Sequence, residues 1–154
     1  MRMKKAFKDE YNFFPKTWVL PQEMTDFKAQ FGKAKKGAHK IFIVKPVHLC
    51  QGRGIFLVRR FEDVELKQGD QYVAQRYLNN PYLIEGLKFD LRVYALVYGV
   101  DPLRVFIYQE GLARFATQEY KAPSQHPKNI DNLFMHLTNY AIQKKSEAFE
   151  FNED

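Results

Sequence analysis

Alternating apolar and polar residues over residues 88–108 constrain the fold of this chain more than any other feature. The apolar positions before the turn are Phe89, Leu91, Val93, Ala95 and Val97. A turn sequence, Gly99-Val100-Asp101-Pro102, then leads into a β-branched and aromatic run over residues 103–108. Alternation with period two beside a Gly- and Pro-containing turn predicts a long antiparallel hairpin that buries its apolar face.

Shorter runs predict the remaining elements. They are an extended segment over residues 13–21, a helix over 22–36 with Gly37 as its C-cap, and strands over 40–45, 55–58 and 71–78. Residues 47–54 hold two glycines and no periodicity, which predicts a loop. Together these elements predict an α+β domain, in which an antiparallel sheet packs against helices on one side.

Composition excludes several classes of protein. The 154 residues contain no apolar run near the ~20 residues that a membrane-spanning helix needs, and no apolar signal segment follows the basic start. Cys50 is the only cysteine and the four histidines lack paired spacing, so neither a disulfide framework nor a zinc site is expected. Nothing resembles a Ser-His-Asp arrangement, so catalysis by a protein nucleophile is not indicated.

Charge is distributed unevenly along the chain. Residues 1–60 carry fourteen Lys or Arg against four Asp or Glu, a net charge of +10. Residues 61–154 carry ten against fourteen, or −4, which together give the +6 of the whole chain. Such a basic segment attracts an anionic partner, although surface lysines also serve solubility alone.

Lys45 lies at the end of an apolar run, where a buried ammonium group is costly unless an anion compensates it. The loop Gln51-Gly52-Arg53-Gly54 follows, and its small residues would let backbone N–H groups approach a phosphate. This loop matches neither the G-x-x-x-x-G-K-[ST] nor the G-x-G-x-x-G pattern. A tight turn with a surface arginine explains the same residues, so both interpretations stay open.

Lys88, Asp90 and Arg92 would share one face of a strand, because alternate side chains point the same way. This strip of charges suits a polyphosphate, with Asp90 on a base or a ribose hydroxyl. Cross-strand ion pairs, worth about 0.2–1 kcal/mol each, are the alternative. Arg114 could clamp a carboxylate or form a salt bridge with Glu110.

The segment Thr138-Asn139-Tyr140 places hydrogen-bonding groups inside apolar surroundings. Buried polar groups need partners, which a ligand could supply. A helix or turn cap is the alternative explanation.

Six motifs, in this order, resemble one family. They are Phe14-Pro15-Lys16-Thr17-Trp18; Lys45-Pro46 with Cys50-Gln51-Gly52-Arg53-Gly54-Ile55; Lys88-Phe89-Asp90-Leu91-Arg92-Val93-Tyr94; Asp101-Pro102-Leu103-Arg104; Glu110-Gly111-Leu112-Ala113-Arg114-Phe115-Ala116-Thr117; and Met135-His136-Leu137-Thr138-Asn139-Tyr140-Ala141. From about residue 13 to residue 145 the chain resembles the tubulin tyrosine ligase-like family, and specifically its polyglutamylase branch.

The resemblance implies an ATP-grasp fold and ATP-dependent ligation. The chain would hold an incomplete ATP-grasp unit, with a basic N-terminal segment and helix over residues 1–38 and a partial nucleotide-binding domain over residues 39–154. In the implied reaction, ATP activates a glutamate side chain of the acidic tubulin C-terminal tail as an acyl-phosphate. The amino group of a free glutamate then displaces phosphate.

The resemblance also implies a role for each matching residue. The expected ATP contacts are Lys45, Gln51, Gly52, Gln75, Arg76, Tyr77, Leu78, Lys88, Phe89, Asp90, Thr138 and Asn139, with residues 75–78 receiving adenine by backbone hydrogen bonds. The expected contacts of the incoming glutamate are Arg114 and Tyr140. The expected catalytic residues are Arg92, which would face phosphate, and Arg53, which would face the protein substrate or the transferred phosphate.

Magnesium is implied as well, but the acidic-x-Asn pattern of such metal sites is absent here, and Asn152-Glu153-Asp154 does not supply it. We therefore expect the metal ligands to lie outside this chain. We also expect the chain to be a fragment that is inactive alone, since triphosphate charge without magnesium is poorly compensated.

The expected partners are free glutamate and the acidic tails of tubulin or microtubules, without nucleic acid or membrane. A monomer in the cytoplasm and on the cytoskeleton, with the cilium or basal body as further locations, is the matching expectation. A non-catalytic tubulin- or microtubule-binding module is the main alternative, and it would tolerate Lys45→Ala. A nucleic-acid binder, suggested by a pI near 9.3, is disfavoured because no RNP, KH or zinc motif occurs.

Overall fold

The computed structural model describes residues 2–31, 40–123 and 126–150, which form two compact units. The first unit comprises Met1–Pro81 and Lys121–Leu133, and the second comprises Tyr82–Tyr120 and Phe134–Asp154. The expected domain boundary between residues 38 and 39, and the expected C-cap Gly37, lie outside the described residues. None of the described helices is long and apolar enough to cross a membrane.

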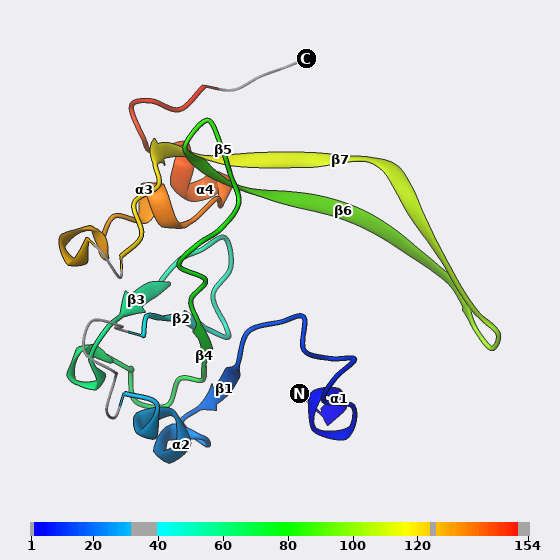
Figure 1. Ribbon diagram of the computed structural model, residues 1–154, viewed down its shortest axis with the longest axis horizontal. Helices are drawn as coiled ribbons and strands as arrows, with labels where there is room; N and C mark the ends of the chain where they lie inside the picture. Colours follow the sequence, from blue (N-terminus) through cyan, green and yellow to red (C-terminus); the bar gives the residue numbers. More distant parts are fainter. Residues whose placement is uncertain (1, 32–39, 124–125, 151–154) are drawn as a thin grey trace. The chain divides into compact units, whose positions relative to one another are not determined.

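An antiparallel sheet of four strands forms the first unit. Its strands, in spatial order, are β1 (Thr17–Leu20), β4 (Tyr72–Arg76), β2 (Phe42–Pro46) and β3 (Phe56–Val58). The described residues of this unit also form four short helices: α1 (Arg2–Ala6), α2 (Met24–Ala29), and the 3-10 helices η1 (Phe61–Asp63) and η2 (Pro127–Asn129). Figure 1 shows the four strands in this spatial order.

The core of the first unit lies between this sheet and α2. Its buried members are Trp18, Leu20, Phe27, Phe42, Val44, Val58, Tyr72 and Ala74. The ring centroid of Trp18 lies 5.4 Å from that of Phe27 on α2 and 5.7 Å from that of Phe42 on β2. Buried aromatic rings in such tilted and edge-on contacts contribute most of the apolar burial that holds a short helix to a sheet.

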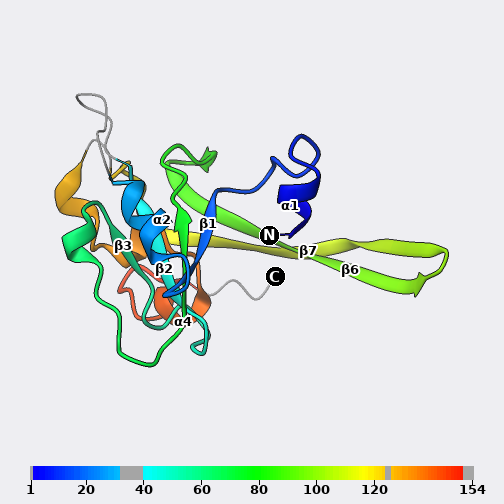
Figure 2. The same cartoon turned by 90° about the horizontal axis from the view of Figure 1, so that it is seen from below.

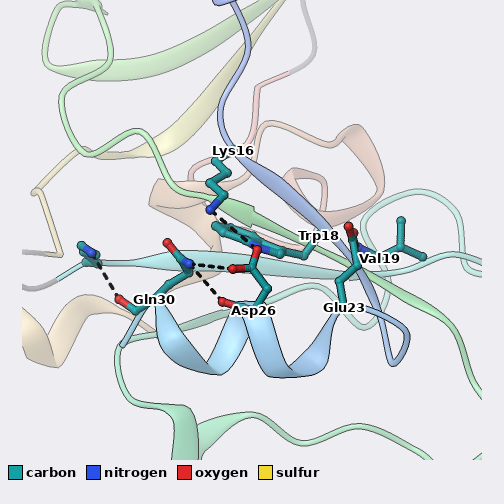
Figure 3. Close-up of polar contacts among 7 residues, drawn as sticks. Lys16, Trp18, Val19, Glu23, Asp26 and Gln30 are labelled. Carbon is teal, nitrogen blue, oxygen red and sulfur yellow. Dashed lines mark hydrogen bonds and ion pairs between the residues drawn. The ribbon is translucent and has the colours of Figure 1, made fainter. Parts of the chain in front are cut away.

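Polar contacts join β1 to α2 at the edge of this core. The indole Nε1 of Trp18 donates a hydrogen bond to Asp26 Oδ2 at 2.7 Å, and Lys16 Nζ lies 3.7 Å from the same oxygen (Figure 3). The backbone N–H of Val19 donates to Glu23 Oε2 at 2.7 Å. The indole N–H of the buried tryptophan thus has a hydrogen-bond partner. Leaving this buried N–H without a partner would cost about 1–3 kcal/mol of stability.

The second unit is built on a three-stranded antiparallel sheet. Its strands are β5 (Leu83–Ile84), β6 (Leu87–Val100) and β7 (Leu103–Glu119), in that spatial order. The strands β6 and β7 run side by side as a long ribbon in Figures 1 and 2. Two short helices, α3 (Leu133–His136) and α4 (Tyr140–Gln143), follow later in the chain.

Three register shifts interrupt the β6–β7 ladder, between Leu87 and Phe89, Val93 and Ala95, and Val97 and Gly99. The two strands approach closely at Gly111, where an added Cβ would lie 2.5 Å from the backbone oxygen of Arg92. Because no real Cβ tolerates that distance from backbone, only glycine fits this point of the ribbon without a backbone shift.

The α+β class and the antiparallel pairing expected from the sequence are confirmed, and so is the hairpin over residues 88–108. Other expectations are wrong in detail. The strands form two sheets rather than one, α2 ends at Ala29, and β2 continues through Pro46, whose position at a strand end requires no N–H donor. The strand β1 lies where only an extended segment was expected, and β7 continues to Glu119.

The hairpin does not bury its apolar face as expected. Leu91 and Val93 are exposed, and Phe89 is only half-buried. Alternation predicts which side chains share a face, but whether that face is covered depends on what packs against it.

Candidate functional site

Lys45 is the main candidate for ligand binding in the first unit. Its side chain lies on β2, is half-buried, and donates a hydrogen bond from Nζ to Gln75 Oε1 at 3.1 Å. The Nε2 of Gln75 donates to Thr17 Oγ1 at 2.9 Å, and that hydroxyl donates to the backbone oxygen of Pro15 at 2.9 Å. This chain of bonds crosses three strands of the sheet and orients the ammonium group.

Burial lowers the pKa of Lys45 below its ordinary value, because desolvation disfavours the charged amine. Among the described residues no carboxylate forms an ion pair with it, and its recorded partner is a neutral amide. A half-buried cation held by a neutral partner attracts an anion more strongly than a solvated one does. Lys45 therefore fits a phosphate group.

The loop after β2 is a tight turn, in which the backbone N–H of Arg53 donates to the backbone oxygen of Cys50 at 3.2 Å and that of Ile55 donates to the backbone oxygen of Gly52 at 3.4 Å. Gln51, Gly52 and Gly54 have φ values of 59°, 83° and 68°, all in the left-handed region. Successive backbone N–H groups in a turn can form a concavity that holds an anion. Arg53 is exposed and donates from Nη2 to the sulfur of Cys50 at 3.6 Å. The tight-turn interpretation describes the same loop, so its geometry is compatible with both.

The predicted adenine segment lies on β4 and just beyond it. The backbone N–H of Arg76 donates to the backbone oxygen of Lys16 at 2.8 Å, and that of Tyr77 donates to the backbone oxygen of Ile41 at 2.9 Å. A base would therefore use other main-chain groups of this segment, such as those around the exposed Leu78. Burial lowers the pKa of Arg76, whose guanidinium lies 5.8 Å from the ring centroid of Phe42.

A groove of about 1140 Å³ opens beside this loop in the first unit. Its lining includes Pro46, Leu49 and Gly54 from the segment after β2, and charged side chains of both signs. The four basic residues of the lining are His48, Arg59, Arg60 and Lys67, and the four acidic ones are Asp63, Glu65, Asp70 and Asp131. Because acidic side chains line the groove beside the basic ones and Lys45 is not among the lining residues, we do not assign the groove to the triphosphate.

Asp90 on β6 is the centre of the candidate residues in the second unit. Its Oδ1 accepts hydrogen bonds from Arg114 Nε at 3.0 Å and Nη2 at 2.6 Å, and its Oδ2 accepts one from the hydroxyl of Thr138. Asp90 and Arg114 are direct cross-strand partners in the β6–β7 ladder. The expected alternative of a cross-strand ion pair is thus confirmed for Asp90, and the partner of Arg114 is Asp90 rather than Glu110.

The other candidate residues of the second unit differ in their contacts and exposure. Lys88 Nζ donates to the backbone oxygen of His136 at 2.7 Å, and the ring of Phe89 stacks on that of Phe115 at 5.5 Å. Asn139 immediately precedes α4, but its side chain makes no capping hydrogen bond. The remaining two, Arg92 and Tyr140, are exposed.

Sequence reasoning missed two residues that hold these clusters in place. Thr17 orients Gln75, which in turn orients Lys45. Gln143 is buried, accepts a bond from the backbone N–H of Thr117 at 2.9 Å and donates to the backbone oxygens of Phe134 and Leu137. A glutamine inside the apolar run after residue 132 was the available signal, since a buried amide must find partners.

No group of three or more His, Cys, Asp or Glu in the part of the chain that the structure describes could hold a metal ion. The sequence Asn152-Glu153-Asp154 lies outside the described residues.

Comparison with known proteins agrees with the motifs. The profile of the Tubulin-tyrosine ligase family matches residues 1–154. The chain belongs to this family.

Individual relatives carry narrower names. A "Probable beta-tubulin polyglutamylase" of Tetrahymena thermophila is 56% identical over 154 residues, which is 100% of this chain and 12% of that protein. "Tubulin polyglutamylase ttll6" of Danio rerio is 50% identical over 153 residues, 99% of this chain and 19% of that protein. "Tubulin polyglutamylase TTLL13" of Homo sapiens is 50% identical over 148 residues, 96% of this chain and 17% of that protein. The chain thus spans less than a fifth of each of these relatives.

Proposed function

We propose that this chain is part of an ATP-dependent tubulin polyglutamylase with an ATP-grasp fold, and that it supplies residues that bind ATP and glutamate. The observation that carries the proposal is Lys45, a half-buried ammonium group with lowered pKa whose recorded partner is a neutral amide. The names of the relatives, at 50–56% identity over at least 96% of the chain, support the choice of substrate.

ATP, when bound, supplies the phosphoryl group that activates a carboxylate for amide formation. Lys45 would place its ammonium group against phosphate oxygens, with Gln75 and Thr17 holding its orientation. Gln51 and Gly52 would offer backbone N–H groups from the left-handed loop. Such preorganised cations and dipoles stabilise developing charge without a protein nucleophile.

Arg114 would bind the carboxylate of the incoming glutamate. Two of the five N–H groups of its guanidinium are held by Asp90 Oδ1, which leaves three for a ligand. Thr138 occupies the second oxygen of Asp90, so this carboxylate is held from both sides. Asp90 would thereby keep Arg114 in position, and Tyr140 would be a further glutamate contact.

The remaining assignments rest on the family motifs. Residues 75–78, Lys88, Phe89 and Asn139 would contact the nucleotide, and Arg92 would face phosphate. Arg53 would face the protein substrate or the transferred phosphate. Magnesium would be held by residues other than those described. The protein would act as a monomer on the acidic tails of tubulin, on the cytoskeleton and at the cilium or basal body.

The test is nucleotide binding by the 154-residue chain, measured by displacement of a fluorescent ATP analogue with ATP. We expect Lys45→Met to weaken binding at least tenfold, about 1.4 kcal/mol, because the phosphate loses its buried cation. The exposed Lys121→Met, in the same unit, is the matched control and should bind as the parent does. Equal affinity of the parent and Lys45→Met would favour the non-catalytic binding module instead.

A second measurement addresses turnover. With tubulin, ATP, magnesium and radiolabelled glutamate, we expect no incorporation by this chain alone, since it spans less than a fifth of the relatives. Robust incorporation would contradict that expectation while leaving the nucleotide result intact.

A further inference from the structure

The groove of about 1140 Å³ in the first unit has no role in the proposed reaction. All of its lining residues belong to that unit. Apolar side chains form part of the lining, among them Pro46, Leu49, Phe56, Leu57 and Leu66. The volume exceeds the range of about 300–1,000 Å³ that is typical of small-molecule pockets. An open groove of this size with apolar walls fits a segment of polypeptide.

Four of the charged residues along the groove have partners within it. Arg60 donates two hydrogen bonds to the carboxylate of Asp63, at 2.6 and 3.1 Å. The hydrogen bond from Arg60 lowers the pKa of Asp63, so this carboxylate is charged at neutral pH. His48 Nε2 lies 3.6 Å from Asp70 Oδ2. These four side chains therefore need no ligand.

Two other donors along the groove lack an acceptor in the part of the chain that the structure describes. Arg59 is half-buried, and its guanidinium has no ion-pair or hydrogen-bond partner there. The hydroxyl of Tyr72, a residue that is 4% exposed, accepts a hydrogen bond from the backbone N–H of Lys67 at 3.2 Å, but its own proton has no acceptor. Donors left without acceptors in a poorly solvated place cost stability. A ligand carboxylate suits the guanidinium, and a carboxylate or a main-chain carbonyl suits the hydroxyl.

The exposed charges of the groove restrict the ligand further. Lys67, Glu65 and Asp131 line it, and none of them forms an ion pair with a described residue. A polyanion, such as nucleic acid or a run of glutamates, would be repelled by Glu65 and Asp131. A purely basic segment would leave Arg59 without a partner. A segment that carries both an acidic and a basic side chain complements the groove.

We propose that this groove is a docking site for a partner protein, which contributes a segment with a large apolar side chain flanked by an acidic and a basic residue. The apolar side chain lies against the apolar walls, the carboxylate pairs with Arg59, and the basic group pairs with Glu65 or Asp131. The mixed charge of this segment distinguishes it from an acidic tubulin tail. The inference does not depend on ATP binding or ligase activity.

The test is peptide binding by the 154-residue chain, measured by fluorescence anisotropy of labelled twelve-residue peptides. Five peptides repeat the triplets Glu-Leu-Lys, Glu-Leu-Glu, Lys-Leu-Lys, Ser-Leu-Gln and Glu-Ser-Lys, so they vary charge and the apolar residue separately. Measurement at 300 mM NaCl screens association with the basic part of the chain. We expect the Glu-Leu-Lys peptide to bind at least tenfold more tightly than each of the other four. It should also slow hydrogen exchange over residues 65–72.

Two substitutions remove the unpaired donors. Arg59→Met should weaken binding of the Glu-Leu-Lys peptide at least tenfold, and Tyr72→Phe, which keeps the buried ring, should weaken it at least threefold. Arg104→Met and Tyr98→Phe make the same changes at exposed residues of the second unit and are the matched controls. Fluorescence of Trp18 and far-UV circular dichroism check that the variants fold.

A change of the exposed charges tests the preference for mixed charge without altering the buried groups. The double variant Glu65→Lys, Asp131→Lys should bind the Glu-Leu-Glu peptide at least tenfold more tightly than the parent does. The same two-charge change at Glu110 and Glu147, which are exposed in the second unit, is its control.

Several results would overturn the proposal. They are the absence of any preference for the Glu-Leu-Lys peptide, binding of that peptide that both Arg59→Met and Tyr72→Phe retain, equal affinity of the parent and the double variant for the Glu-Leu-Glu peptide, and a homodimer of the chain that occupies the groove and that the Glu-Leu-Lys peptide does not dissociate.

Discussion

Lys45 illustrates, at the scale of a residue, how tertiary packing changes the chemistry of a side chain. Its place after an apolar run was visible in the sequence, but its partner Gln75 lies 30 residues away. Half-burial against a neutral amide lowers the pKa of the amine. The same burial that costs stability prepares the group for an anion.

This lowered pKa predicts how stability depends on pH. The unfolded chain binds the Lys45 proton more tightly than the folded chain does. The free energy of unfolding that is lost by burying the charged amine is therefore lost in full at neutral pH. This loss diminishes as the pH rises through the folded pKa toward the unfolded value of about 10.4. Lys45→Met should therefore be more stable than the parent near pH 7, by a margin that shrinks as the pH rises toward the unfolded value of about 10.4.

The measurement is urea unfolding followed by the fluorescence of Trp18, the only tryptophan, which is buried in the core of the first unit. Lys121→Met is the control and should show no pH-dependent difference from the parent. A margin that stays constant from pH 7 to pH 10.5 would contradict the assignment of the lowered pKa to Lys45.

At the scale of elements, the β6–β7 hairpin is the clearest case of local sequence predicting structure. Alternation and the turn at residues 99–102 predict both the strands and their antiparallel pairing, because each signal acts over a few residues. The helices α3 and α4 are different, since each has only four residues and depends on tertiary contacts for stability.

Gln143 supplies those contacts and carries a second prediction. Its amide joins β7, α3 and the segment before α4 through three backbone partners. Gln143→Leu should destabilise this junction by about 1–3 kcal/mol, because buried backbone groups lose their partners. Hydrogen exchange at the amide of Thr117 should then accelerate about 5- to 150-fold.

The exposed neighbour Lys145 provides the control, since Lys145→Leu adds the same side chain without removing a buried bond. Exchange at Thr117 that is equal in Gln143→Leu and Lys145→Leu would show that the glutamine does not hold the junction.

At the scale of the whole molecule, the uneven charge is the main determinant of long-range association. Residues 1–60 carry +10 and the remainder −4. An anionic polymer should therefore bind through the first part of the chain, and increasing salt should weaken that binding by screening.

We expect poly-L-glutamate to bind this chain and to lose at least tenfold in affinity between 50 and 300 mM NaCl. Replacing Lys8 and Lys28 by Gln should weaken binding further, whereas the same change at Lys121 and Lys128 should have a smaller effect. Fluorescence anisotropy of a labelled polymer gives both values. Equal competition by RNA at the same ionic strength would favour a nonspecific polyanion binder over a tubulin-tail partner.

Much of this protein could be predicted from sequence. The hairpin, the strands around residues 42, 57 and 74 and the family follow from local patterns and from motif order. The loop at residues 51–54 was also recognisable, because two glycines in a short span require a turn. The length of α2 was overestimated, since apolar spacing alone does not specify where a helix ends.

Only the tertiary structure decided which side chains meet. Gln75 and Thr17 are 58 residues apart, Asp90 and Arg114 are 24 apart, and Thr138 is 48 residues from Asp90. The sequence by itself determined the period, the turn and the chemistry available at each position, because those depend on neighbours along the chain. The register between distant strands depends on contacts between residues far apart in the sequence, and so does the covering of an apolar face. No local sequence pattern encodes these contacts.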